Sequence, residues 1–306
     1  MQRTITPGIY VPTLSFFKDD ESLDLETLRH HISRVAQAGI AGIVTLGSNG
    51  EAAHLDVEER IAVTRTTRET LDKEGYGHFP IIVGASAQSA RETIKLCRDA
   101  ATAGGSHVLV LPPCYFRGAM TEEAIYNFYI KVADGSPLPL VLYSFPAVVT
   151  GIEMSSDLLV RVSAHPNVVG TKFTCGDTGK LARVARAMTG SEYATLGGLA
   201  DFELQAFVAG ASGAIVGGGN VTPKACVKVF QLFKEEKYKE AMELQSLLAA
   251  GDWHHTSKGI GATKAALEKF FSYGGSPRSP LTSPPEEVTS SIATGMDELI
   301  QLENSL

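Results

Sequence analysis

Short apolar segments recur eight times along this chain, and most are followed by an amphipathic stretch of helical length. The apolar segments cover residues 8–16, 41–46, 80–85, 107–111, 138–143, 168–173, 193–196 and 214–216. The amphipathic stretches include residues 25–38, 58–71, 90–103, 121–133, 155–164 and 180–188. Strands that alternate with helices of this length are typical of a parallel sheet covered by helices. Eight such units predict an α/β fold, a (β/α)8 TIM barrel, because an open doubly wound sheet usually has fewer strands.

The pattern changes after Pro223, where the apolar strands stop. Four helices are expected there, at residues 224–233, 235–250, 257–271 and 286–302. Gly251, residues 274–277 and the Pro284-Pro285 pair are expected to separate them, because glycine and proline end helices. The first of these helices would complete the barrel. The sequence therefore predicts a catalytic barrel domain at residues 1–234 and a C-terminal helical region at residues 235–306.

The composition narrows the possible partners. A formal net charge of -7 argues against nucleic acid or an anionic membrane as the main partner. No apolar run reaches the roughly 18 residues that a membrane-spanning helix needs. The cysteines show no CxxC spacing, and the N-terminus runs almost directly from Met1 into the first apolar segment. These features favour a cytoplasmic protein without a signal peptide, with a small molecule as its partner.

Lys172 places a charged side chain in the apolar segment 168–173. Side chains alternate along a strand, so Val168, Gly170 and Lys172 are expected on one face. An ionised lysine buried without a partner loses several kcal/mol of hydration, whereas a desolvated amine that gives up its proton attacks carbonyl carbons. Gly170 would leave room for a small ligand on that face. A lysine at a strand end whose ammonium reaches water is the ordinary alternative.

Other polar groups are expected on the same rim, because the active site of a (β/α)8 barrel lies at the carboxyl ends of its strands. Tyr143 ends the fifth predicted strand, and Gly47-Ser48-Asn49-Gly50-Glu51 (the 47–51 turn) follows the second. A glycine-rich turn before a helix presents free N–H groups, which bind a carboxylate or a phosphate. Each feature alone has an ordinary explanation. Together with Lys172, they predict a catalytic site on this rim.

Four motifs support a family resemblance. They are the 47–51 turn, Pro113-Cys114-Tyr115, Tyr143 with Pro146 and Gly151 after it, and Gly170-Thr171-Lys172. With these motifs the chain resembles the dihydrodipicolinate synthase/N-acetylneuraminate lyase family over essentially its whole length. Within the family it is most similar to the 4-hydroxy-2-oxoglutarate aldolases and to the fungal 2-keto-3-deoxy-L-galactonate (L-threo-3-deoxyhexulosonate) aldolases. The resemblance implies a class I aldolase, a lyase that releases pyruvate and an aldehyde from a 4-hydroxy-2-oxo acid.

The resemblance also implies roles for individual residues. Lys172 would form a Schiff base with pyruvate, and Tyr143 would relay a proton with help from Ser48. Gly47, Ser48 and Asn49 would hold the substrate carboxylate. A protonated imine accepts the electrons of the breaking C3–C4 bond far better than a ketone does, and a tyrosine can take the proton from the C4 hydroxyl group. This chemistry requires neither a metal ion nor an organic cofactor.

Tyr115 would reach into the site of a neighbouring subunit, as the resemblance implies. An aromatic pair, Tyr115-Phe116, in an otherwise polar loop also favours an interface. The expected assembly is a homo-oligomer, either a dimer or a dimer of dimers (a homotetramer). Packing of both rings against their own barrel is the alternative.

The segment after Tyr143 bears on the substrate. Dihydrodipicolinate synthases carry an arginine there that holds the carboxylate of aspartate semialdehyde, whereas residues 146–151 of this chain contain none. A charge-assisted hydrogen bond contributes about 1.5–3 kcal/mol, so its loss argues against that substrate. Neutral or small groups at the rim could instead contact substrate hydroxyl groups: Thr174, Asp177, Gly198, Ile215, Asn220 and Thr222. We therefore expect 3-deoxy-2-oxo sugar acids slightly ahead of 4-hydroxy-2-oxoglutarate, for whose second carboxylate Arg117 is the candidate cation.

Two other functions remain open at this point. The first is dihydrodipicolinate synthase, which condenses pyruvate with aspartate semialdehyde. The second is a barrel that binds a 2-oxo acid without catalysis, although such a protein would be expected to lose Lys172 or Tyr143. A metal-dependent aldolase is disfavoured, because histidine and carboxylate ligands do not cluster at the predicted strand ends.

Overall fold

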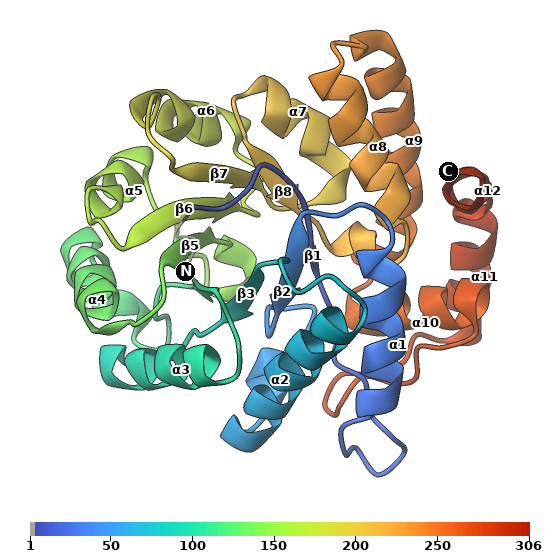
Figure 1. Ribbon diagram of the computed structural model, residues 1–306, viewed down its shortest axis with the longest axis horizontal. Coiled ribbons are helices and arrows are strands. Elements are labelled where there is room, and N and C mark those ends of the chain that lie inside the picture. Colours follow the sequence, from blue (N-terminus) through green and yellow to red (C-terminus); the bar gives the residue numbers. More distant parts are fainter. Residues whose placement is uncertain (1–3) are drawn as a thin grey trace.

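The eight expected strands close into one barrel of parallel strands in the computed structural model, which describes residues 4–306 (Figure 1). They are β1 (Gly8–Pro12), β2 (Gly42–Thr45), β3 (Ile81–Gly84), β4 (His107–Val110), β5 (Leu140–Ser144), β6 (Val168–Phe173), β7 (Ala194–Gly197) and β8 (Gly213–Ile215). Each strand pairs with the next along the chain, and β8 pairs with β1 through Gly8–Gly213 and Tyr10–Ile215. The predicted TIM barrel is confirmed. The first three residues, on which part of the N-terminal expectation rests, lie outside the described residues.

Eight helices surround the strands (Figure 1). They are α1 (Leu25–Ala36), α2 (Val57–Lys73), α3 (Ala90–Thr102), α4 (Glu122–Gly135), α5 (Ser156–Ser163), α6 (Thr178–Ala187), α7 (Glu203–Val208) and α8 (Pro223–Lys234). Side-chain oxygens cap most of their N-termini, including a reciprocal capping box between Asp56 and Glu59 at α2. Helix α7 was not predicted, because Glu203, Leu204 and Phe207 are all buried and the short segment has no polar face.

Short 3-10 turns follow five of the strands. They are η1 (Ala52–His54), η2 (Arg117–Ala119), η3 (Pro146–Val148), η4 (Ala200–Phe202) and η5 (Gly217–Asn220). All five lie in loops that leave the carboxyl ends of strands, so they shape the rim where a barrel places its active site. No helix in the described part of the chain is both long enough and apolar enough to cross a membrane.

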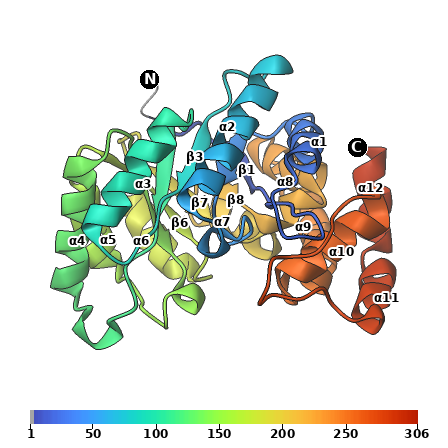
Figure 2. The ribbon, with the colours of Figure 1, turned by 90° about the horizontal axis from the view of Figure 1, so that it is seen from below.

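The C-terminal helices are α9 (Tyr238–Thr256), α10 (Ile260–Phe271), α11 (Glu286–Gly295) and α12 (Asp297–Ser305). Figure 2 shows α10, α11 and α12 grouped at one side of the barrel, with α9 between them and the strands. Two predictions about this region are wrong. Gly251 lies inside α9, where a Cβ atom would stand 2.5 Å from Leu299 Cδ2, so glycine allows α12 to pack closely. Residues 286–302 form two helices, which meet at Gly295 and Met296.

A bulge in β6 changes which side chains face the barrel interior. Leu140 of β5 pairs with Val168, but Val141 pairs with Gly170, so Val169 is the extra residue. Val168 packs in the outer core beneath the helices, whereas Val169 packs against the interior cluster. The prediction that Val168 shares a face with Lys172 is therefore wrong. Without the bulge, strict alternation from Val168 would direct Lys172 outward.

Two carboxyl groups are buried beside the barrel, on Glu203 of α7 and Asp252 of α9. Asp252 lies against η5, since a Cβ atom on Gly218 would stand 2.2 Å from its Oδ1 atom. Burial raises the pKa of Asp252 to about 7. Burial also raises the pKa of Glu203 well above its usual range, and the nearby Asp252 carboxyl adds to this effect. These groups make the stability of the fold depend on pH.

The wild-type protein should lose stability as the pH rises, because the buried Asp252 carboxyl ionises. Replacing Asp252 with asparagine should remove this loss. The pKa of Asp252 in the folded protein exceeds its ordinary value of 3.8, so its contribution to stability is lost as the pH rises from 3.8 to about 7. The free energy of unfolding of Asp252→Asn, minus that of the wild type, should therefore become roughly 2–4 kcal/mol more positive from the lower to the upper end of this pH range. Urea unfolding at pH 4.5 and 7.5 measures the difference. A constant difference would show that Asp252 does not titrate in this range.

Candidate active site

Lys172 and Tyr143 lie side by side at the carboxyl ends of β6 and β5, because the register of these strands pairs the two residues. Lys172 Nζ donates a hydrogen bond to Tyr143 Oη at 3.3 Å and lies 4.4 Å from the centre of the tyrosine ring. Only 4% of Lys172 is exposed. Within residues 4–306 no carboxylate forms a salt bridge with it, unlike the buried Lys180 and Lys264, which pair with Glu153 and Glu51. Lys172 is therefore a buried amine whose neighbour is a hydroxyl group.

The 47–51 turn begins directly after β2 and holds an unusual backbone conformation. Leu46 and Glu51, at its two ends, have φ values of 57° and 50° in the left-handed region, which costs a non-glycine residue about 1–3 kcal/mol. Gly50 lies so close to Leu46 N and Thr13 O that a Cβ atom would be crowded. Ser15 Oγ donates to Gly50 O at 2.7 Å. The surrounding structure therefore fixes the turn.

The inner part of the turn is available to a ligand. Glu51 N donates to Ser48 O at 3.1 Å, which closes the turn. The backbone N–H groups of Ser48 and Asn49 have no acceptor among the residues that the structure describes. Two adjacent free N–H groups of this kind can bind a carboxylate.

A cavity of about 400 Å³ connects the turn to Tyr143. Its lining includes Gly47, Ser48, Tyr143, Val148 and Val149. This volume falls within the usual range for small-molecule sites, and most of the wall is apolar with a few polar groups. Arg60 of α2 also contributes to the wall.

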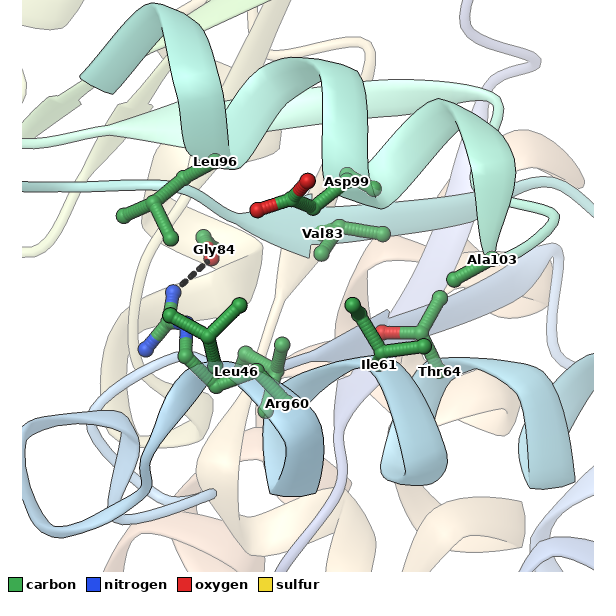
Figure 3. Close-up of a pocket in the computed structure, with 11 residues that line it drawn as sticks. Leu46, Arg60, Ile61, Thr64, Val83, Gly84, Leu96, Asp99 and Ala103 are labelled. Carbon is green, nitrogen blue, oxygen red and sulfur yellow. Dashed lines mark hydrogen bonds between the residues drawn. The ribbon is translucent and has the colours of Figure 1, made fainter. Parts of the chain in front are cut away.

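Arg60 donates hydrogen bonds to two backbone carbonyl groups close to the 47–51 turn. It donates to Ala52 O at 2.8 Å and to Gly84 O at 2.6 Å, and Figure 3 shows the second of these contacts. The cavity drawn there, between α2 and α3, has a volume of only about 10 Å³ and cannot hold a substrate. The role of Arg60 in the fold is to join η1 to the end of β3.

The structure brings together two of the expected substrate contacts, Thr174 and Gly198. A Cβ atom on Gly198 would stand 2.2 Å from Thr174 Oγ1, so only glycine fits there. The Thr174 hydroxyl is buried and has no hydrogen-bond partner among residues 4–306. A buried hydroxyl group without a partner is costly, and the expectation that Thr174 contacts a substrate hydroxyl group stays a prediction. Ile215 lies in the interior cluster with Tyr143.

Asn220 does not have the environment of a substrate contact. Its side chain is fully buried, and its Nδ2 atom donates to Pro12 O at 3.0 Å and to Gly217 O at 2.8 Å. Its Oδ1 atom lies 2.9 Å from His31 Nε2. The amide thus holds η5 in place, and the expectation that it binds substrate stays a prediction. Asp177 is also structural, because it caps α6 by accepting from Lys180 N.

Tyr115 and Phe116 project from the loop after β4, with 78% and 70% of their surfaces exposed. Their rings contact each other edge to face with centres 5.1 Å apart. Gln88 Oε1, in the loop after β3, accepts from the N–H groups of Cys114 and Tyr115 at 2.8 and 2.9 Å, which fixes the backbone of the loop while both rings stay exposed. The alternative that both rings pack on their own barrel is wrong.

Three charged residues near the turn were not assigned a role from the sequence. Glu51 was named only as the last residue of the 47–51 turn, yet its side chain is buried and pairs with Lys264, 213 residues away. Arg278 donates its backbone N–H to the same carboxylate at 2.9 Å. No sequence pattern links these positions, because the contact depends on how the C-terminal region packs against the barrel.

Comparison with known proteins identifies the family of the chain. The family model described as the Dihydrodipicolinate synthetase family matches residues 6–298. The chain belongs to this family. It is 48% identical to an L-threo-3-deoxy-hexylosonate aldolase from Hypocrea jecorina, over 98% of both chains. It is 44% identical to a probable 4-hydroxy-2-oxoglutarate aldolase, named as mitochondrial, from Emericella nidulans, over 99% of this chain and 98% of that one.

A solved structure of this family is similar throughout. The crystal structure of a dihydrodipicolinate synthase family protein from Coccidioides immitis aligns with a TM-score of 0.90 and 33% identity, over 100% of this chain and 99% of that one. The family resemblance inferred from the sequence is confirmed, and so is the fold. The C-terminal helices are included in the match.

Lys172→Ala and Lys172→Arg should both abolish turnover, because alanine has no amine and a guanidinium group stays protonated and cannot attack a carbonyl carbon. Lys180→Met is the matched control, since Lys180 is also buried but pairs with a carboxylate. Steady-state assays of pyruvate release should show at least a tenth of wild-type activity for this control. Turnover by either Lys172 variant would remove Lys172 from the mechanism.

Tyr143→Phe should preserve the fold and imine formation but lower kcat by about a hundred- to ten-thousand-fold, the usual contribution of general acid–base catalysis. Rapid-quench measurement of imine formation separates this step from cleavage. A kcat near that of the wild type would leave Ser48 or water as the relay.

Proposed function

We propose that this protein is a class I aldolase that cleaves a 4-hydroxy-2-oxo acid to pyruvate and an aldehyde through an imine on Lys172. The observation that supports this most directly is the hydrogen bond between Lys172 and Tyr143, since Tyr143 shares a cavity with Gly47 and Ser48 of the 47–51 turn. The names of the relatives that match over nearly the full chain agree with an aldolase.

The proposed reaction assigns each step to a group in the site. The 47–51 turn binds the substrate carboxylate, and the amine of Lys172 attacks the C2 carbonyl carbon to form a carbinolamine. Tyr143 gives its phenol proton to the departing hydroxide, so that water leaves and a protonated imine and a phenolate remain. Tyr143 Oη then accepts the proton of the C4 hydroxyl group as the C3–C4 bond breaks. The bonding electrons move to the iminium nitrogen and leave an enamine. Protonation at C3 and hydrolysis release pyruvate and restore the lysine, so the cycle uses no metal ion or organic cofactor.

The wall of the cavity favours a sugar-acid substrate. Val148 and Val149 line it where the dihydrodipicolinate synthases carry their arginine. Arg117, the cation expected from the sequence, is exposed in η2 and is not part of the lining. Arg60 does line the cavity, but its two terminal nitrogens donate to backbone carbonyls. A second substrate carboxylate would therefore lack a free cation. The Thr174 hydroxyl lies outside this lining but is buried without a partner, and it is the neutral group proposed to bind a hydroxylated tail.

The same wall argues against the two alternatives. Aspartate semialdehyde would enter without the cation that a charged carboxylate requires. A protein that only binds a 2-oxo acid would have no use for a tyrosine hydroxyl held at hydrogen-bond distance from a buried amine. We also propose that residues 1–234 form the barrel domain and residues 235–306 the C-terminal helical region. The proposed location is the cytoplasm, although the Emericella nidulans relative is named as mitochondrial.

The kcat/KM for L-threo-3-deoxyhexulosonate should exceed that for 4-hydroxy-2-oxoglutarate, because only the second substrate places an unpaired carboxylate in the cavity. Both cleavage rates should exceed condensation of pyruvate with aspartate semialdehyde. Coupled assays of pyruvate release and consumption measure all three. Dominant condensation would refute the aldolase proposal, and a preference for 4-hydroxy-2-oxoglutarate would reverse only the order of the first two.

Tyr115→Ala should lower both activity and self-association, because the exposed Tyr115-Phe116 pair is proposed to complete the site of a neighbouring subunit in a dimer or a dimer of dimers. Sedimentation velocity and kcat/KM, measured on the same samples, test this. Tyr238→Ala is the control, since Tyr238 is also exposed but lies on α9, far along the chain from the rim loops. A fully active monomeric wild type would contradict the shared site.

A further inference from the structure

The C-terminal region contacts the 47–51 turn through a buried ion pair. Lys264 of α10 donates from Nζ to Glu51 Oε1 at 2.7 Å, and both side chains are fully buried. Lys264 Nζ also donates to Ser276 O at 3.0 Å and lies 4.6 Å from the centre of the Phe17 ring. Burial has removed the hydration of both charges. Their mutual attraction and a few polar contacts replace the lost water, whereas an ion pair on the surface keeps its hydration.

Glu51 is the residue through which this contact acts on the turn. Its backbone is left-handed, and its N–H group donates to Ser48 O. Its second carboxylate oxygen, Oε2, accepts the backbone N–H of Arg278 at 2.9 Å. Both oxygens of the carboxylate are thus held by residues of the C-terminal region. The hydrogen bond from Glu51 N to Ser48 O closes the turn. The position of Glu51 therefore sets the direction of the Ser48 and Asn49 N–H groups.

The C-terminal region also supports the neighbouring turn, η5. Tyr273 Oη lies 2.8 Å from His31 Nδ1, and the other ring nitrogen of His31 faces Asn220 Oδ1. Burial lowers the pKa of His31 to about 3, so the ring is neutral and connects the two groups. The Asn49 side chain in turn lies close to Gly217 of η5. The 47–51 turn and η5 thus contact each other, and residues of the C-terminal region support both of them.

We propose that Lys264 is a positioning residue for the reaction: its ion pair with Glu51 orients the 47–51 turn, and so sets the affinity for the carboxylate of the 2-oxo acid. Lys264 does not touch the substrate. This inference rests on the proposed function, because it assumes that the turn binds that carboxylate. A helical region outside the barrel thereby determines substrate affinity.

Lys264→Met tests the proposal, because methionine fills a similar volume without the charge. The concentration of pyruvate that gives half-maximal borohydride trapping, and the KM of the cleavage substrate, should both rise at least tenfold. At saturating substrate, kcat should stay within about threefold of the wild type, since Lys172 and Tyr143 are unchanged.

A second variant separates positioning from a general loss of stability. Lys264→Met leaves the Glu51 carboxylate buried without its lysine cation, with the Arg278 N–H group and His54 Nδ1 as its remaining contacts. The double variant Lys264→Met/Glu51→Gln removes that charge and should recover much of the lost Tm. Its KM should stay raised, because the turn is still not held. Should Lys264→Met fail to fold, the double variant and Glu51→Gln alone give the same test.

Glu303→Ala is the matched control. Glu303 of α12 is also a buried carboxylate in the C-terminal region, and it accepts from Lys224 N at 3.1 Å and Ala225 N at 2.8 Å, away from the 47–51 turn. Its loss should lower the Tm without changing KM. An equal rise in KM for this control, or a wild-type KM in folded Lys264→Met, would overturn the positioning role. Absence of pyruvate trapping in the wild type would instead overturn the proposed function.

Discussion

The register between β5 and β6 is the constraint on which the site depends. The bulge at Val169 advances β6 by one residue, so that Lys172 lies opposite Tyr143 and not opposite Ser144. The same bulge reverses the direction of the side chains that follow it. Val168 can therefore pack under the helices while Lys172 points into the barrel. One extra residue in a strand thus places an amine and a phenol within hydrogen-bond distance at the rim.

The remaining parts of the site are held in place around this pair. Closure of the barrel brings the ends of β2, β5 and β6 to one rim, although they are far apart in the sequence. The 47–51 turn is preceded by the left-handed Leu46 and ends at the left-handed Glu51. Its conformation is secured by Ser15 from one side and by Lys264 and Arg278 from another. The C-terminal region therefore contacts the turn of the proposed active site directly, through Lys264 and Arg278.

Features that depend on local pattern could be predicted from the sequence. The strands and most helices follow from apolar segments, caps and spacing, and Lys172 was recognised as a charge in a buried strand. Features that depend on packing could not. Glycine generally predicts the end of a helix, but Gly251 lies inside α9, where its lack of a side chain lets α12 pack closely. Asn220 has the polarity of a ligand, yet its neighbours use its amide. Nothing local indicates that Glu51 pairs with Lys264 or that Val169 forms a bulge.

The central claim is that Lys172 is the amine that forms the imine, and peptide mass spectrometry after reduction tests it most directly. The wild-type protein is incubated with pyruvate and borohydride, digested and analysed for a reduced pyruvyl adduct. Lys180 is the informative competitor, because it is also buried and desolvation lowers its pKa to about 8. The account predicts that the adduct lies on the peptide containing Lys172. An adduct confined to Lys180 or another lysine, or no adduct at saturating pyruvate, would contradict it.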